Sequence, residues 1–342
     1  MKANEEVYQL SSLDGLKRAI AQQYTVYEVT EDSSETLHWS DDGDGQSFRE
    51  QTKLPLTSPK AWLFAEKELL YIFDGQRFVE TLPEASPQAF WGVRACDLAA
   101  IAYTDQFFAD DPYYKQRREK TFLVGVDCII PCKNGFCSLT QSGPFVDGYC
   151  DLVIHPVENG NKPWLLRAVT EKGQEILNSL GLDKVPSGWQ DNYLQAKEKA
   201  TQAMLIEDNV RAGVELIVHD SVSDQTWEKI AVQCTACTGC TSVCPTCSCY
   251  VTESQPVSEE NASATHVRYW DSCLLEGFQK EASGHNPTAE AGQRVKRFWR
   301  HKFGERYKSE MGRWGCVGCG RCDDVCVGVI GARSLFKRVS DS

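Results

Sequence analysis

The chain has 342 residues, of which 42% are hydrophobic and 25% charged, an ordinary globular composition with enough length for two or three domains. Its net charge of −12 argues against a nucleic-acid partner, because no overall positive field would attract phosphate. Because the N-terminus lacks the apolar core of a secretory signal and no apolar stretch is long enough for a membrane span, we expect a cytoplasmic protein whose 16 cysteines stay reduced.

Short apolar segments alternate with helical patterns in the first half of the chain. The spacing predicts a helix at 13–24 and a strand at 26–29, followed by an acidic, turn-rich loop at 31–45. Residues 60–157 predict an α/β domain. Its strands are expected at 61–64, 69–73, 90–93 and 121–126, with a crossover helix at 97–108. No strand is followed by Gly-x-Gly-x-x-Gly or a P-loop, so we expect any nicotinamide or flavin to be held by another polypeptide.

The middle of the chain is predominantly helical. Helices are predicted at 168–180, at 191–216 and at 227–232, the last one leading into a cysteine-rich segment. A stretch rich in Ser, Glu and Pro at 253–265 predicts a surface loop. The basic and aromatic residues at 294–303 alone would suggest a nucleic-acid surface, but in an acidic chain they favour hydrogen bonds to backbone carbonyls or a partner subunit.

Two runs of cysteines, about seventy residues apart, dominate the last third of the chain. They are Cys234, Cys237, Cys240 and Cys244, followed by a proline, and Cys316, Cys319, Cys322 and Cys326. Spacings of two, two and three residues are typical of two-cluster ferredoxins, in which the fourth cysteine of each run binds the cluster of the other run. Two zinc sites are the alternative, but paired CxxC knuckles do not require the third cysteine or the proline.

This exchange rule assigns the ligands of two [4Fe–4S] clusters. Gly239, Gly318 and Gly320 are expected to permit the tight turns that bring the backbone close to the inorganic sulfide. Cluster 1 would be bound by Cys234, Cys237, Cys240 and Cys326, and cluster 2 by Cys316, Cys319, Cys322 and Cys244.

Eight further cysteines raise the question of additional centres. If the strands at 90–93 and 121–126 are neighbours, their ends bring together Cys96, Cys128, Cys132 and Cys137, as a third cluster, a metal site or ordinary core thiols. Cys247, Cys249 and Cys273 are either packing residues around the clusters or a further metal site or redox pair. Cys150 has no companion and is expected to be inert.

Several motifs together resemble one family: the two-cluster iron–sulfur subunits represented by the beta subunit of cytoplasmic sulfhydrogenases and by the corresponding iron–sulfur subunit of anaerobic sulfite reductase. The motifs lie between residues 90 and 330. They are GVRACDL at 92–98, CPTCSCY at 244–250, WDSC at 270–273, GHN at 284–286, HKF at 301–303 and CVGCGRC at 316–322. The chain departs from the family pattern in two places. Cys132 stands upstream of Gly135, Phe136 and Cys137 where Cys-Phe-Cys is common, and Val327 replaces the usual proline after Cys326.

The resemblance implies an electron-relay subunit with no catalysis of its own. Its partners would be a flavin-containing NAD(P)H-oxidoreductase subunit together with the subunits of a nickel–iron hydrogenase or, alternatively, a sirohaem sulfite reductase. A different hypothesis makes the α/β domain itself a sulfur or polysulfide reductase, and a zinc-stabilised scaffold is a third. For the fold, we predict an α/β domain at 1–160, a helical connecting segment at 161–230 and an α+β two-cluster ferredoxin-like domain at 231–342.

Overall fold

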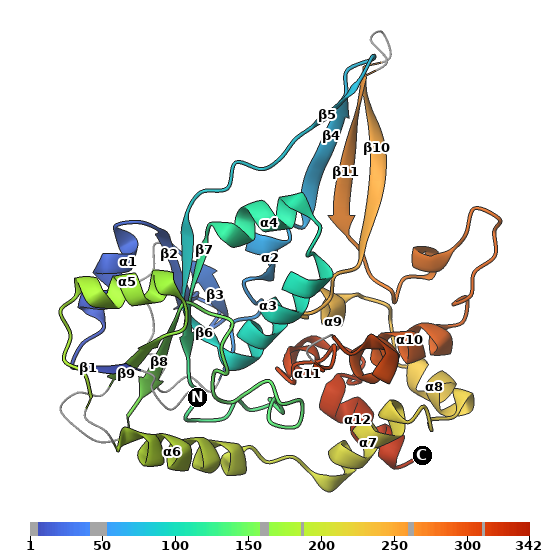
Figure 1. Cartoon of the computed structure of the whole chain (residues 1–342). Coiled ribbons are helices and arrows are strands. Elements are labelled where there is room, and N and C mark those ends of the chain that lie inside the picture. The colour runs from blue at the N-terminus through green and yellow to red at the C-terminus, as the bar shows by residue number, and fades with distance from the viewer. Residues whose placement is uncertain (1–5, 42–52, 158–163, 186–187, 259–262, 310–311) are drawn as a thin grey trace.

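A seven-stranded sheet forms the N-terminal part of the protein in the computed structural model, which describes residues 6–41, 53–157, 164–185, 188–258, 263–309 and 312–342 (Figure 1). The central strands β2, β6, β7 and β8 run parallel, and β1, β9 and β3 are antiparallel additions at the two edges. In spatial order the strands are β1 (Val7–Leu10), β9 (Trp164–Ala168), β8 (Leu152–Pro156), β7 (Thr121–Val126), β6 (Gln88–Arg94), β2 (Thr25–Glu31) and β3 (Leu37–Ser40).

Helices cover both faces of this sheet. Strand β7 is buried at every position, and its alternating side chains explain why: Phe122 and Val124 face α1 (Asp14–Ala21) and α5 (Glu171–Ser179), while Leu123 faces α3 (Ala95–Phe107). The parallel pairing of β6 with β7 confirms the predicted strand, crossover helix and strand.

Two local predictions in this region are wrong. The apolar segment 61–64 is the short helix α2 (Lys60–Leu63), because four apolar residues alone do not distinguish a buried helical turn from a strand. The expected loop at 31–45 contains β3 within its described residues, and the buried Leu37 and Trp39 pack onto the sheet. Residues 42–45 of that prediction lie outside the described residues.

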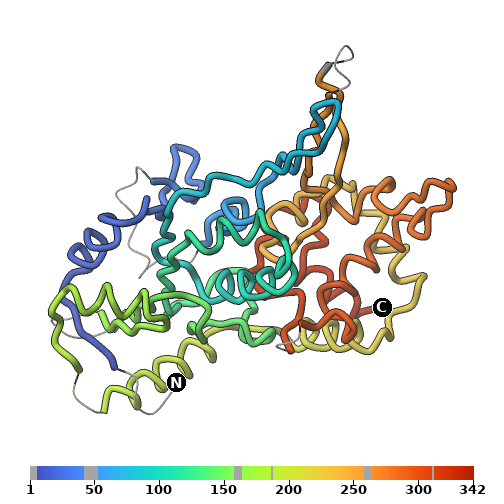
Figure 2. The backbone as a smooth tube through the Cα atoms, turned by 45° about the horizontal axis from the view of Figure 1, so that its top comes forward, coloured from blue at the N-terminus to red at the C-terminus, as the bar shows by residue number. Residues whose placement is uncertain are grey.

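A second sheet forms an arm that projects from the body of the molecule (Figures 1 and 2). Its strands, in spatial order, are β10 (Tyr250–Ser258), β11 (Ser263–Trp270), β4 (Lys67–Phe73) and β5 (Phe78–Glu80). The predicted strand at 69–73 therefore exists but belongs to this arm. The predicted loop at 253–265 is wrong in its described part: it is the end of β10 and the start of β11, and Pro256 is tolerated because β10 is an edge strand.

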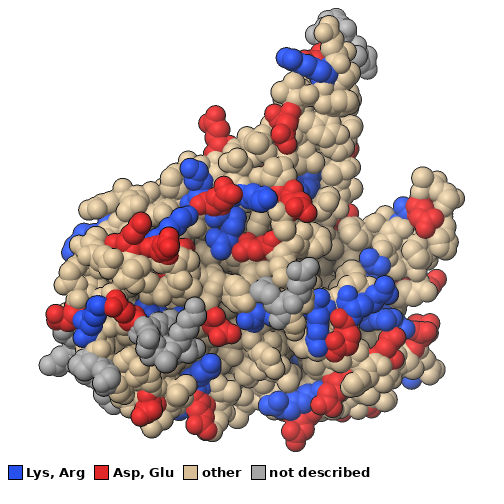
Figure 3. Space-filling model, viewed as in Figure 1, with Lys and Arg blue, Asp and Glu red and all other residues tan. Residues whose placement is uncertain are grey.

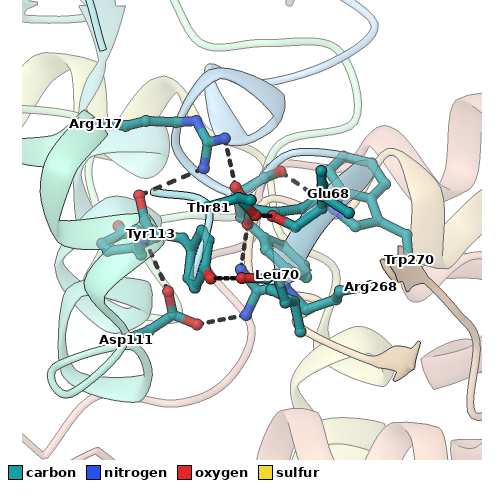
Figure 4. Close-up of polar contacts among 11 residues, drawn as sticks. Glu68, Leu70, Thr81, Asp111, Tyr113, Arg117, Arg268 and Trp270 are labelled. Carbon is teal, nitrogen blue, oxygen red and sulfur yellow. Dashed lines mark hydrogen bonds and ion pairs between the residues drawn. The ribbon is translucent and has the colours of Figure 1, made fainter. Parts of the chain in front are cut away.

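Buried ion pairs hold the base of the arm against α4 (Pro112–Glu119), as Figure 4 shows. Arg268 of β11 forms ion pairs with Glu68 of β4 and with Asp111, the residue that caps α4. Glu68 also pairs with Arg117 of α4. Arg268 therefore links the arm to α4 through buried, charge-assisted hydrogen bonds, which restrict movement of the arm relative to the α/β sheet.

Apart from α6, whose Tyr193 and Ala200 pack with Phe145, the remaining helices pack around one C-terminal core. The predicted helix at 191–216 is two helices, because the chain is extended at Met204 and Glu207. Trp299 and Phe303 of α10 make ring contacts with Phe336 of α12 at 5.2 and 5.3 Å. The helices are α6 (Trp189–Ala203), α7 (Asp208–Val218), α8 (Asp224–Ala231), α9 (Gly239–Ser242), α10 (Ala291–Phe303), α11 (Arg321–Val325) and α12 (Ala332–Ser340), with 3-10 turns η1 (Glu276–Gln279) and η2 (Glu305–Tyr307).

The N-terminal part is thus an α/β sheet region and the C-terminal part a ferredoxin-like region. The division at 1–160, 161–230 and 231–342 stays a prediction; strand β9 at 164–168 belongs to the first sheet, and β4 pairs with β11. None of the helices in the described ranges has the length and hydropathy needed to cross a bilayer.

The contact between α7 and α12 leads to a stability prediction. A Cβ atom added at Gly213 would lie 2.1 Å from the Phe336 carbonyl oxygen, so Gly213→Ala must push the helices apart. We expect the free energy of unfolding to fall by about 1–3 kcal/mol, measured by denaturant titration of tryptophan fluorescence. The control is Gly15→Ala in α1, where nothing lies within 4 Å of the new methyl group and we expect a gain of about 0.4–1 kcal/mol. Equal effects of the two substitutions would contradict this packing.

Candidate metal centres

The two cysteine runs adopt the same backbone conformation. In the first run the left-handed residues are Ala236 (φ 52°) and Thr238 (φ 63°), and in the second they are Gly318 (φ 62°) and Gly320 (φ 81°). These positions stand two and four residues after the first cysteine of each run. In both runs a short helix, α9 or α11, then begins, with the third cysteine as its second residue. The runs are therefore two copies of one loop, which wraps three thiols around a common space.

The predicted role of Gly239 is not found. Gly239 is the first residue of α9 and has no positive φ, whereas Ala236 and Thr238 make the turns in that run. Left-handed backbone is unfavourable for residues with a Cβ atom, so the first run carries strain that glycine relieves at Gly318 and Gly320. A bound group that fixes the loop would offset such strain.

Four cysteines from both runs line one cavity at the protein surface: Cys234, Cys237, Cys240 and Cys326. Burial and then the neighbouring charges of Cys244, Cys326, Cys234 and Cys237 raise the pKa of Cys240 to about 12. The Cys326 sulfur accepts a hydrogen bond from the Ile330 amide at 3.3 Å. Cys237 is exposed, so this predicted cluster 1 site meets solvent on one side.

A second group lies deeper and consists of the cysteines assigned to cluster 2. Burial raises the pKa of Cys316, Cys319 and Cys322. The negative charge of at least one other cysteine of the group raises each of these pKa values further. Cys244 acts on both Cys316 and Cys319, which places it with the second run despite its position in the first. The Gly318 amide donates to the Cys316 sulfur at 3.4 Å.

Two buried ammonium groups stand beside Cys244. Lys302 of α10 donates to the Thr246 hydroxyl at 2.9 Å, and that hydroxyl lies 3.3 Å from the Cys244 sulfur. Burial alone would lower the pKa of Lys302, but the charges of Cys244, Cys247 and Cys316 raise it well above its ordinary value. Lys60 of α2 donates to the carbonyls of Ser242 and Cys247 at 3.2 and 3.4 Å. This positive charge favours thiolates here, the form in which cysteine binds metal.

The third group of cysteines forms at the carboxyl edge of the parallel strands. Cys96 lies in the first turn of α3, directly after β6, and Cys128, Cys132 and Cys137 lie on the segment after β7. The charges of Cys128 and Cys132 raise the pKa of Cys137, and the charge of Cys137 raises the pKa of Cys96. The four thiols are therefore neighbours. The Arg94 guanidinium lies 3.6 Å from the Cys128 sulfur and is buried with it. Burial and then the charge of Cys128 raise the pKa of Cys132 to about 12.

This third group abuts the second run, as the adjoining green and red segments in Figure 2 indicate. The Phe136 amide donates to the Gly318 carbonyl at 2.7 Å, and a Cβ atom at Gly318 would lie 2.7 Å from the Cys137 nitrogen. Cys319 acts electrostatically on both Cys96 and Cys137. The second run is thus in contact with the third group on one side and, through Cys244 and Cys240, with the first group on the other.

One buried ion pair fastens this junction. Arg321, which lies within the second run, donates two hydrogen bonds to the Asp97 carboxylate of α3 at 2.6 and 2.8 Å. Both side chains are almost fully buried, at 2% and 0% exposed. The Arg321 Nε atom also donates to the Pro55 carbonyl at 2.9 Å. A fixed arginine therefore lies between the cysteines of the second and third groups.

The donor set suits an iron–sulfur cube better than a single ion. Within each group the thiols lie close together and, apart from Cys237, are at least partly buried, so ionised sulfur needs compensating positive charge that iron would supply. In the described part of the chain, no three His, Cys, Asp or Glu side chains converge as ligands of one ion. A cube does not require such convergence, because each thiolate binds a different iron atom at its own corner.

The basic segment at 294–303 lies on α10 and is largely engaged within the protein. Arg294 donates to the carbonyls of Thr288 and Ala289, as expected from the sequence. Lys296 pairs with Asp224 at 2.8 Å, and Lys302 is buried beside the thiols. On the face shown in Figure 3, basic and acidic side chains are interspersed rather than gathered in a basic field.

The fold and the cysteine geometry define an iron–sulfur protein, and the comparisons agree. Residues 233–330 match the family model of the 4Fe–4S dicluster domain. No solved structure matches the chain. The matched segment contains all eight cysteines of the two runs, so the presence of 4Fe–4S clusters is supported, whereas their number and ligands stay predictions.

A relative identifies the family more closely. The chain is 33% identical over 243 residues to a protein named Sulfhydrogenase 2 subunit beta from Pyrococcus furiosus, and the matched region covers 69% of each chain. The chain therefore belongs to the family of sulfhydrogenase beta subunits, as the motifs predicted. It is an iron–sulfur subunit of the electron-transfer class.

Sequence reasoning misses the buried charges around the cysteines. The pattern of the basic segment places Lys302 among surface cations, and nothing in the sequence points to Lys60. Arg94, Asp97 and Lys302 stand in the GVRACDL and HKF motifs, which do not tell what these side chains contact. Arg321 offers a signal, because it stands between two cysteines of a run, where a solvated side chain has little room. Most of the others are distant in sequence from the cysteines that they contact, so no spacing indicates them.

Proposed function

We propose that this chain carries electrons, one at a time, between a flavin-containing NAD(P)H-oxidoreductase subunit, on one side, and a nickel–iron hydrogenase on the other. The observation that supports the proposal is the pair of matched loops, in which the fourth cysteine of each run lies beside cysteines of the other run. Cluster 1 would be held by Cys234, Cys237, Cys240 and Cys326, and cluster 2 by Cys316, Cys319, Cys322 and Cys244. Such clusters supply reversible one-electron transfer.

A third cluster held by Cys96, Cys128, Cys132 and Cys137 extends the proposal. The contacts of Cys319 with Cys96 and Cys137 support a linear order, with the second run in the middle. The departure from the family pattern at Cys132 is accommodated, because Cys132 is influenced by Cys128 and Cys319 and so reaches the same group. The relay then runs from the surface near Cys237 to the carboxyl edge of the α/β sheet.

The protein residues set the conditions for this transfer. Lys302 and Arg321 place fixed positive charge beside the thiolates, which favours the reduced state of a neighbouring cluster and raises its potential. Lys60 lies near the same thiols, but burial lowers its pKa. Amides of Gly318 and Ile330 donate to ligand sulfurs and likewise favour the reduced state.

Three exposed valines stand close in sequence to cysteines of the first group. Val232, Val327 and Val329 are 86%, 72% and 60% exposed, although valine is usually a core residue. Val327 also lines the cavity that holds Cys237 and the other cysteines of the first group. Such a surface suits contact with a second redox subunit.

Two alternatives differ in what this relay serves. A sirohaem sulfite reductase could take the place of the hydrogenase, because the motifs of this chain also resemble those of the iron–sulfur subunit of anaerobic sulfite reductase. The name of the matched relative favours the hydrogenase complex. If the α/β region were itself a sulfur or polysulfide reductase, the isolated chain with an artificial reductant would turn over such substrates in a way that depends on Cys96, Cys128 and Cys137, and we expect no turnover that these three cysteines support.

Iron analysis tests the number of clusters. Protein purified without oxygen is expected to contain about twelve iron and twelve sulfide per chain if three cubes are present, and about eight if only the two runs bind. We expect Cys128→Ser to lower the iron content from about twelve to about eight, with the EPR signals of the other clusters retained in the reduced protein. A wild-type value below about eight, or a colourless zinc protein, would contradict the two-cluster assignment.

A further inference from the structure

Four cysteines remain outside the groups described above, and three of them, Cys247, Cys249 and Cys273, lie at the base of the arm, where there is a cavity. Cys247 and Cys249 line this cavity of about 110 Å³, together with Lys60, Trp270 and Asp271. Cys273 lies just behind it and is 2% exposed. The cavity has room for a few atoms of a small molecule and opens beside a thiol.

The strand register of the arm places Cys249 and Cys273 together. Cys249 immediately precedes β10 and Cys273 closely follows β11, and the two strands pair from Tyr250 and Trp270 onward. The Asp271 amide donates to the Cys249 carbonyl at 3.0 Å, which continues the ladder past its last named pair. The Cys273 thiol then hydrogen-bonds to the Cys249 sulfur. The arm thus fixes two thiols in contact, one facing the cavity and one behind it.

The charges around the two thiols make them unequal. The hydrogen bond from Cys273 lowers the pKa of Cys249 to about 6 against the opposing effect of burial, and the positive charges of Lys302 and Arg297 contribute. The same hydrogen bond, with burial, raises the pKa of Cys273. The Lys60 amine, 3.8 Å from the Trp270 ring centre, adds a cation to the cavity wall, and the Asp271 carboxylate adds an anion. The charges around the pair therefore favour the thiolate at Cys249, on the cavity wall, and the protonated thiol at Cys273.

An accessible thiolate with a protonated thiol behind it is the arrangement of a thiol–disulfide exchange centre. We propose that Cys249 and Cys273 form a redox-active dithiol that reduces small disulfides admitted by this cavity, and that it draws on the proposed relay for its electrons. Cys249 is the attacking residue, and Cys273 is the resolving residue.

The exchange balances in two steps. The Cys249 thiolate attacks one sulfur of the substrate disulfide; the substrate S–S bond breaks, a mixed disulfide forms at Cys249, and the first product thiolate takes a proton from solvent. Cys273 then loses its proton to the second product sulfur and attacks the Cys249 sulfur, which releases the second thiol. One substrate disulfide has been reduced to two thiols, and Cys249 and Cys273 have been oxidised to one disulfide.

Restoring the resting pair, a Cys249 thiolate and a Cys273 thiol, requires two electrons and one proton. The proposed relay supplies the electrons singly, and a route is present in the contacts: the Cys247 thiol hydrogen-bonds to the Cys244 sulfur, and Cys247 lies two residues from Cys249 on the cavity wall. Lys60 and Lys302 both lie near Cys244 and Cys247, because the charges of these two cysteines act to raise the pKa of each lysine. The cavity is therefore a side branch of the relay at the second run.

The test uses the whole chain with its clusters and the probe bis(2-hydroxyethyl) disulfide, followed by alkylation, tryptic digestion and mass spectrometry. Wild-type protein is expected to give a disulfide between fragments 230–268 and 269–280, with two equivalents of 2-mercaptoethanol released per chain. Cys273→Ser is expected to stop at the mixed disulfide, seen as a mercaptoethanol adduct on Cys249. Cys249→Ser is expected to give neither product. Cys150→Ser, in which a buried thiol of the α/β sheet is removed, is the control and should behave as wild type.

Iron content separates this proposal from its main competitor. Both variants are expected to keep the wild-type iron and the EPR signals of the clusters. Loss of about four iron atoms in either variant would make the two cysteines cluster ligands and overturn the proposal, as would the absence of the linked fragments in wild type. If the disulfide forms but NAD(P)H and the partner subunits cannot reduce it, the dithiol stands and the proposed relay fails.

Discussion

Replacing Cys319 with serine is expected to remove one cluster and interrupt electron flow to the terminal subunit. Cys319 belongs to the second run, is partly buried, and acts electrostatically on Cys96 and Cys137 of the third group, so it occupies the middle of the proposed relay. A serine hydroxyl is a poor substitute for the soft thiolate that iron–sulfur clusters require. Iron should fall by about four atoms per chain, and reduction of the flavin subunit by NAD(P)H should remain intact.

The measurement compares two activities of the assembled complex. One is the reduction of an artificial acceptor at the flavin subunit, and the other is the overall reaction between NAD(P)H and the terminal subunit. Cys150→Ser is the matched control, because Cys150 is buried but belongs to none of the groups. Unchanged overall turnover in Cys319→Ser, with its iron reduced, would exclude a relay through the second run.

The second large effect is expected at the ion pair between Arg321 and Asp97. Arg321→Met leaves the Asp97 carboxylate buried at 0% exposure without its two hydrogen bonds. Removing one partner of a buried pair costs about 3–5 kcal/mol, because the remaining charge is uncompensated. The Pro55 carbonyl also loses its donor. Unfolding in denaturant, followed by cluster absorbance and tryptophan fluorescence, should shift to correspondingly lower concentrations.

A double variant separates the loss of the pair from the loss of packing. Arg321→Met combined with Asp97→Leu removes both charges, and we expect most of the stability to return, since apolar replacement of a buried pair is often nearly neutral. Arg18→Met, at an arginine on the solvent side of α1, is the control and should change stability by less than about 0.5 kcal/mol. If the double variant is as unstable as the single one, the uncompensated charge is not the cause.

The sequence predicts best what depends on neighbouring residues. Strands β6 and β7 are predictable because continuous apolar runs are typical of strands buried on both faces. The cysteine runs are recognisable because their ligand spacing is local. Even the third group follows from topology, since parallel neighbours end at one edge of a sheet. The structure brings these four thiols together at the place where the sequence suggests a third centre.

The sequence predicts poorly what depends on distant partners. Strand β10 is polar and largely exposed, so Glu253 and its neighbours have the composition of a loop, and only pairing with β11 and then β4 makes them strands. Lys302 has the pattern of a solvated cation on a basic helix, yet the thiols of another segment hold it in the interior. In both cases tertiary contacts outweigh local propensity.

The arm has a consequence for the biogenesis of the protein. Glu68 and its partner Arg268 are separated by 200 positions, so the edge of β4 has no β11 to pair with until most of the chain has been translated. At about 5–20 residues per second, the ribosome needs roughly 10–40 s to deliver the missing strand. During that interval β4 presents an unpaired edge that favours aggregation, and Cys273 and the whole second cysteine run have not yet been made. Closure of the arm therefore precedes complete cluster assembly, and a nascent chain that stalls between the two cysteine runs exposes thiols to oxidants and to chaperones.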